Sequence, residues 1–103
     1  MGNDEVREAC GLSVFQEAAE QYDKLYVSIL GELCQPCQEL KQLVRDADIP
    51  YPIVEVPSGI CPEIAGYYGV VATPTVVLLS RGNVIAKHNG PPEAIVERMK
   101  RGE

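Results

Sequence analysis

The sequence predicts one α/β domain, in which a mixed central sheet is flanked by helices and completed by a C-terminal β-hairpin and helix. Helical and strand-like patterns alternate through most of the chain, which is typical of strands joined by right-handed helical crossovers. The last two strand patterns are separated only by Arg81-Gly82, which favours a hairpin. A chain of 103 residues with 46% hydrophobic residues suits one core rather than two. We therefore treat residues 1–103 as one domain, in which residues 1–12 show no clear pattern.

The first half of the chain contains two helical patterns on either side of an apolar strand. Apolar residues recur at helical spacing from Ser13 to about Tyr22, and Ser13 is suited to cap that helix. Residues Leu25–Leu30 are apolar almost throughout, as expected of a central strand covered on both faces. The next helix extends to about Ala47, and it begins at or just after Cys34 because Pro36 is tolerated only in a first turn.

The second half contains shorter elements separated by glycine and proline. A short helix is predicted to start at Pro62 and to be closed by Gly69. The remaining predictions are a strand over residues 52–56, a buried strand over 75–79, a second hairpin strand over 83–88 and a final helix over 91–100.

Charge and hydropathy exclude several classes of partner. Nine Lys and Arg against fifteen Asp and Glu give a net charge of −6, which argues against binding nucleic acid. No apolar run approaches the roughly 18 residues of a membrane span, and the N-terminal residues lack a signal-peptide pattern. We expect a monomeric, cytoplasmic protein with no membrane partner.

Two of the four cysteines, Cys34 and Cys37, form a C-x-x-C motif. In a reducing compartment this spacing indicates redox chemistry or a metal site. Backbone N–H groups at the start of a helix favour a thiolate, so the pKa of Cys34 should lie below that of a free thiol. Cys37 follows one helical turn later, close enough to form a disulfide and shielded by the domain. We predict that Cys34 attacks, that Cys37 resolves, and that the reversible disulfide needs no bound cofactor.

The alternative is a zinc site completed by Cys10 and Cys61. Four cysteine sulfurs are a common structural zinc set. Cys10 and Cys61 do not form a second C-x-x-C pair, however, and Pro36 would stiffen a knuckle that is usually flexible. We therefore predict no metal. Cys61, just before Pro62, is also placed to have a lowered pKa, but a cysteine at such a position is more often a small packed residue.

A second motif, Thr73-Pro74-Thr75, stands at the start of a buried strand. Proline is rare within a central strand but is allowed at its first residue. A cis peptide bond before Pro74 would turn the chain sharply and expose the Thr73 backbone beside the cysteines.

Together, Cys34-Gln-Pro-Cys37 and Tyr68-Gly-Val-Val-Ala-Thr-Pro-Thr75 resemble the thioredoxin family over residues 13–100. The resemblance implies the thioredoxin fold and reduction of protein disulfides, with electrons supplied by a thioredoxin reductase or a ferredoxin-dependent reductase. It assigns the catalytic pair to Cys34 and Cys37. It assigns contacts with the bound partner to Leu33, Gln35, Pro36, Thr73, Pro74 and Gly90.

The chain departs from the family pattern at several positions. Leu33 replaces the usual Trp, and Gln35 replaces the usual Gly between the cysteines. The buried acid that assists the second cysteine in the family aligns with Ser28, and its usual lysine partner aligns with Glu55. We therefore consider Glu55 as a replacement acid, provided that burial raises its pKa. The alternative is that Glu55 is an ordinary solvated residue of its strand.

Two other functions fit the same motif. A glutaredoxin-like enzyme would use glutathione, but its motif usually places proline directly after the first cysteine. A redox-inert module that binds metal or a partner on the same scaffold is the alternative from a different class.

Overall fold

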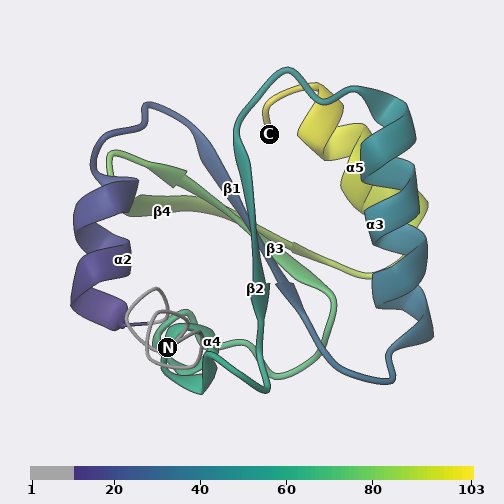
Figure 1. Cartoon of the computed structure of the whole chain (residues 1–103). Coiled ribbons are helices and arrows are strands. Elements are labelled where there is room, and N and C mark those ends of the chain that lie inside the picture. The colour runs from purple at the N-terminus through teal and green to yellow at the C-terminus, as the bar shows by residue number, and fades with distance from the viewer. Residues whose placement is uncertain (1–10) are drawn as a thin grey trace.

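A computed structural model describes residues 11–103, which form a four-stranded sheet between two layers of helices (Figure 1). The strand order is β2-β1-β3-β4, in which β2 runs parallel to β1 and the other pairs are antiparallel. The predicted mixed sheet with a terminal hairpin is confirmed. The elements in chain order are α2 (Leu12–Ala19), β1 (Leu25–Leu30), α3 (Gln35–Ala47), β2 (Ile53–Pro57), α4 (Pro62–Tyr67), β3 (Thr75–Ser80), β4 (Asn83–Asn89) and α5 (Pro92–Lys100).

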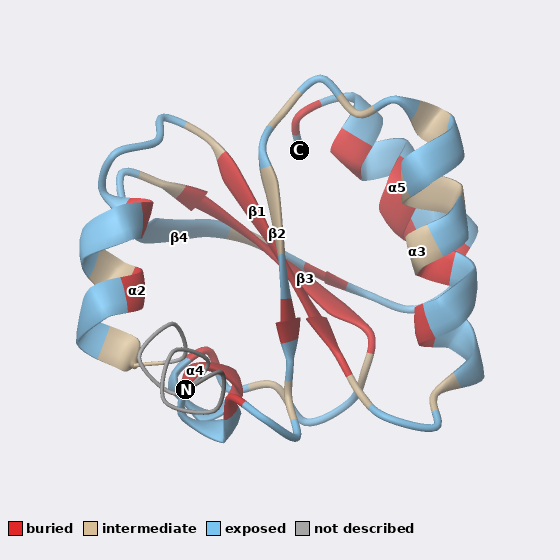
Figure 2. Cartoon of the chain, in the orientation of Figure 1, coloured by how far each residue is buried: buried red, intermediate tan, exposed pale blue. Residues whose placement is uncertain are grey.

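The sheet separates two apolar clusters because successive side chains of β1 and β3 point to opposite faces. Every residue of β1 is buried, as its continuous apolar run predicts, and the buried residues of Figure 2 concentrate in the central strands. Helices α2 and α4 cover one face, and α3 and α5 cover the other. The first cluster includes Phe15, Val27, Ile64 and Val77, and the second includes Tyr26, Cys37, Leu40, Val76, Ile95 and Met99.

The first described helix differs from its prediction at both ends. It begins at Leu12 with Gly11 as N-cap and no side-chain cap, so the proposed Ser13 cap is wrong. It ends at Ala19, and Tyr22 lies beyond it with its side chain 43% exposed. The Tyr22 carbonyl accepts a hydrogen bond from the N–H of Arg81 at 2.8 Å. This contact with the hairpin turn takes Tyr22 out of the helix, and no local pattern reveals it.

The two turns predicted from glycine are confirmed. Gly69 has φ 65°, and its N–H donates to the Gly66 carbonyl, which ends α4. Arg81 and Gly82 have φ 51° and 85°, the pair of left-handed residues that a two-residue hairpin turn requires.

Residues at the C-terminal end of the chain pack against the α3 and α5 face of the sheet. The Tyr26 hydroxyl donates to the Glu103 carbonyl oxygen at 2.6 Å, and a ring nitrogen of His88 lies 2.8 Å from the same atom. Burial raises the pKa of Tyr26 to about 12. His88 is 8% exposed, so its place at the edge of the core agrees with a structural role. Among residues 11–103, no helix has the length and hydropathy to cross a membrane.

Candidate active site

The site is built on the N-terminus of α3. Cys34 is the N-cap residue in an extended conformation, and Pro36 lies in the first turn, as the sequence predicts. The Cys37 N–H donates to Cys34 Sγ at 3.2 Å, and the Gln38 N–H donates to the Cys34 carbonyl at 3.2 Å. The sulfur of Cys34 therefore occupies the position where the first N–H groups of a helix stabilise negative charge.

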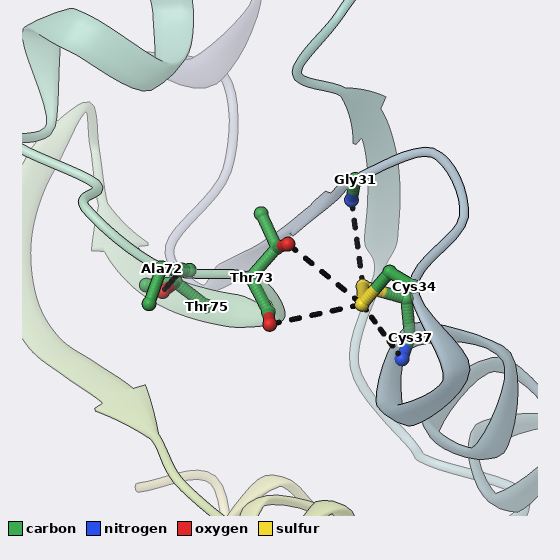
Figure 3. Close-up of a disulfide and its surroundings, with 6 residues drawn as sticks. All are labelled: Gly31, Cys34, Cys37, Ala72, Thr73 and Thr75. Carbon is green, nitrogen blue, oxygen red and sulfur yellow. Dashed lines mark hydrogen bonds between the residues drawn. A yellow bond between two sulfur atoms is a disulfide. The ribbon is translucent and has the colours of Figure 1, made fainter.

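Cys34 and Cys37 form a disulfide with Cα atoms 5.2 Å apart. The two cysteines differ in exposure, since Cys37 is 0% exposed whereas Cys34 is partly exposed. The Gly31 N–H donates to Cys37 Sγ at 3.4 Å (Figure 3). Only the sulfur of Cys34 is therefore accessible to a large disulfide substrate, while Cys37 lies behind it.

The loop that precedes β3 lies directly beside this disulfide. The Thr73–Pro74 peptide bond is cis, which is the conformation that the Thr73-Pro74-Thr75 motif suggested. The Thr73 hydroxyl and carbonyl oxygens each lie 3.7 Å from Cys34 Sγ (Figure 3). The Thr75 hydroxyl donates to the Ala72 carbonyl at 2.6 Å and so holds the loop together. Residues from two distant parts of the chain thus meet at one sulfur atom.

The rim of the site is exposed and largely apolar. Leu33 is 106% exposed and has φ 47°, and Gln35 and Pro36 are also exposed. Val71, which no sequence motif marked as a site residue, is 96% exposed and lies two residues before Thr73. A β-branched apolar residue so close to the Thr-Pro motif was the available signal.

Gly90 lies at the same end of the sheet as Pro74. It follows Asn89, which is paired with Thr75 in the β3–β4 ladder. Gly90 has φ 113°, and the space where a side chain would project is open. An incoming chain can therefore approach the backbone at this point.

The structure places Glu55 at the surface rather than in the buried position that its predicted role requires. Ser28 is 3% exposed and is paired with Glu55 in the β1–β2 register, so both side chains lie on the α3 side of the sheet. Glu55 itself is exposed, because β2 is an edge strand. The burial on which its proposed role depended is therefore absent. Glu55 instead lines an open groove of about 360 Å³ together with Leu30, Gly31, Glu32, Gln38, Lys41 and Pro57.

The arrangement of the cysteines does not suit the four-cysteine zinc site. Cys61 is 4% exposed and packs in the cluster of α2 and α4, whereas Cys34 and Cys37 pack on the opposite face of the sheet. The described residues contain no group of three or more His, Cys, Asp or Glu that is arranged to hold a metal ion. Cys10 lies outside the described residues.

The fold of the chain matches solved thioredoxin structures over most of its length. The chain matches mitochondrial thioredoxin 3 from Saccharomyces cerevisiae in its oxidised form, with 28% identity, a TM-score of 0.73 and coverage of 87% of this chain and 89% of that one. It also matches oxidised thioredoxin from Plasmodium falciparum, with 16% identity, a TM-score of 0.77 and coverage of 89% and 92%. The chain therefore has the thioredoxin fold. No protein-family model and no curated protein matches it.

The thioredoxin fold and the cysteine pair together support thiol–disulfide oxidoreductase chemistry in general. Relative to the thioredoxin pattern, the chain keeps both cysteines and the cis-proline loop. It differs on the rim, where Leu33 and Gln35 stand, and within β1, where the buried residue is Ser28. A serine hydroxyl does not ionise in the physiological pH range, so Ser28 cannot act as the buried acid.

Proposed function

We propose that this chain is a protein-disulfide reductase in which Cys34 is the nucleophile and Cys37 the resolving thiol. The observation that carries the proposal is the asymmetry of the pair. The sulfur of Cys34 is partly exposed and accepts an N–H at the start of α3, while Cys37 is fully buried directly behind it. A thiolate at the first position and an internal thiol at the second are what two-step disulfide exchange requires.

The proposed reaction runs through one mixed disulfide. The Cys34 thiolate attacks one sulfur of a substrate disulfide, forming a Cys34–substrate disulfide and releasing the other substrate sulfur as a thiolate. Cys37, as a thiolate, then attacks Cys34 Sγ, which forms the Cys34–Cys37 disulfide and releases the second substrate thiol. The substrate gains two electrons and the cysteine pair loses two.

The proposed partners follow from this chemistry. The substrate is a protein with an accessible disulfide, and it would contact the exposed rim that includes Leu33, Gln35, Pro36, Val71 and Gly90. Re-reduction of the pair needs an external dithiol donor, for which we propose a thioredoxin reductase or a ferredoxin-dependent reductase. We propose a monomer that works in the cytoplasm without a bound cofactor.

Reduction of insulin by dithiothreitol tests the proposed function. We expect the chain to accelerate precipitation of the insulin B chain catalytically. Cys34→Ser should return the rate to that of dithiothreitol alone, because the remaining thiol of the pair, Cys37, is fully buried. A parallel assay supplies only glutathione and glutathione reductase as the source of electrons. Activity in this assay would indicate a glutaredoxin-like enzyme instead. Stoichiometric metal in anaerobically purified protein, together with no insulin reduction, would favour the redox-inert module.

We further propose that Glu55 assists Cys37 through solvent in the groove beside Gly31 rather than as a buried acid. The carboxylate and the Gly31 backbone, which donates to Cys37 Sγ, line the same groove. Glu55→Gln should slow resolution of a mixed disulfide by about tenfold or less, a weaker effect than direct general-base catalysis. Attack by Cys34 should keep its rate.

Single-turnover kinetics with a disulfide-bonded peptide separate these two steps. Glu39→Gln is a suitable control, because Glu39 is exposed on α3 and is not among the residues that line the groove. Equal resolution rates for Glu55→Gln and Glu39→Gln would remove Glu55 from the mechanism.

A further inference from the structure

The segment between α4 and β3 leads to the disulfide without forming a helix or a strand. Residues 70–74 lie outside both elements, and Val71 and Ala72 are exposed. The later end of this segment is fixed by the sheet, because Thr75 is paired with both β1 and β4 and its hydroxyl donates to the Ala72 carbonyl. The earlier end follows α4 directly, so its position depends on what holds the end of that helix.

A lysine side chain from the hairpin holds the end of α4. Tyr68 and Gly69 follow the last residue of the helix, where backbone carbonyl groups have no helical N–H partner ahead of them. The ammonium nitrogen of Lys87 donates to the Tyr68 carbonyl at 3.0 Å and to the Gly69 carbonyl at 3.1 Å. The next N–H group, that of Val70, donates back to the Ala65 carbonyl at 3.0 Å. These contacts fix the point from which the segment 70–74 starts.

Lys87 reaches α4 from β4, which is an edge strand of the sheet. It is paired with Val77 in the β3–β4 register, and Val77 packs in the cluster that α2 and α4 cover, so the Lys87 side chain leaves the sheet on that face. A cation is favoured beside the carbonyl groups at the C-terminal end of a helix. Among residues 11–103, no carboxylate lies within ion-pair distance of Lys87. The two carbonyl groups are therefore the contacts that hold its ammonium group in place.

We propose that Lys87 is a positioning residue for the protein substrate, because it holds the start of the segment 70–74 and so orders this wall of the site before a substrate arrives. The role rests on the proposed function, in which a substrate disulfide passes along this wall to reach the sulfur of Cys34. Lys87 itself contacts neither the substrate nor the sulfur. Without its ammonium group the wall would become ordered only on binding, and the loss of conformational entropy would then weaken binding.

The rates of the reduced protein with a large and a small reagent test this role. The large reagent is a peptide that contains one intramolecular disulfide, and the small one is iodoacetamide, which alkylates Cys34 without lying along the wall. Lys87→Met removes the ammonium group and keeps an unbranched apolar stem. It should lower the second-order rate constant with the peptide by about three- to fivefold, as loss of exposed hydrogen bonds from a charged donor would. The rate of alkylation should stay the same.

Two further variants separate the contact from a general effect of charge. Lys87→Arg keeps a cationic donor and should restore most of the rate with the peptide. Lys100→Met makes the same change of charge on α5, where Lys100 pairs with the exposed Glu97, and it should react with the peptide as wild type does. The proposal would be overturned by equal peptide rates for wild type and Lys87→Met, by no recovery in Lys87→Arg, or by an equal loss in Lys100→Met. A parallel fall of the peptide and iodoacetamide rates in Lys87→Met would also overturn it.

Amide hydrogen exchange gives a readout that needs no substrate. The Val70 N–H, which donates to the Ala65 carbonyl, directly follows the two carbonyl groups that Lys87 holds. Its exchange should be about three- to tenfold faster in Lys87→Met, whereas the amide of Val77, at the centre of the sheet, should keep its rate. Faster exchange at Val70 in a chain that reduces no disulfide peptide would sink the proposed function alone. Peptide reduction by wild type and Lys87→Met at the same rate would sink this inference alone.

Discussion

Cys37→Ser is expected to stop the reaction after its first step and leave the substrate covalently attached to Cys34. Cys34 keeps its place at the start of α3 and can still attack, because its sulfur accepts the backbone N–H of residue 37, which a serine also provides. The internal thiol that would release the substrate is gone. An intramolecular thiol has a very high effective concentration, so release should slow by more than about 10³-fold.

Intact-mass spectrometry under non-reducing conditions measures this adduct. With a peptide that contains one intramolecular disulfide, Cys37→Ser should gain the mass of the peptide, and dithiothreitol should remove it. Cys34→Ser is the matched control and should form no adduct, because Cys37 is fully buried. An adduct on Cys34→Ser equal to that on Cys37→Ser would reverse the assignment of the two cysteines. Rapid turnover by Cys37→Ser would exclude an internal resolving step.

The centre of the site could be predicted from the sequence because its signals are local. The start of α3 is fixed by a proline that only a first turn accepts, which places Cys34 at the helix N-terminus. The position of Pro74 at the start of β3 follows from the scarcity of proline within central strands. Each inference needs only a few neighbouring residues.

The contacts between distant residues could not be predicted in this way. Gly31 lies so close to the loop before β3 that a Cβ atom added to it would be 2.6 Å from the Thr73 hydroxyl oxygen. This close approach depends on how β1 and β3 pair in register. The exposure of Glu55 depends on β2 being an edge strand, which a short strand pattern does not reveal. Val71 has an apolar side chain like those of the core, so its exposure on the rim is also a tertiary property.

The difference between local and tertiary signals also explains which parts of the fold could be predicted from the sequence. Strands β1 and β3 were predicted from their apolar runs because both are central and buried on two faces. The end of α2 could not be predicted in this way, because the hydrogen bond between Arg81 and Tyr22 comes from a turn about sixty residues later. Helix boundaries that depend on tertiary contacts are the part that local patterns miss.

The helix that presents Cys34 is held to the sheet mainly by its apolar face, and Leu40 is the residue of α3 on which we expect stability to depend most. Leu40 is 0% exposed and lies one turn after Cys37, in the cluster that includes Ile95 and Met99. Leu40→Ala removes buried methyl groups between α3, α5 and the sheet. It should lower the free energy of unfolding by about 2–5 kcal/mol.

Urea denaturation of the oxidised protein measures this loss. The transition midpoint should fall while the slope stays the same, since the surface exposed on unfolding hardly changes. Glu39→Ala is the matched control one residue earlier on the same helix, where the side chain is exposed, and it should stay within about 0.5 kcal/mol of wild type. A loss below about 1 kcal/mol for Leu40→Ala would mean that α3 does not depend on this contact.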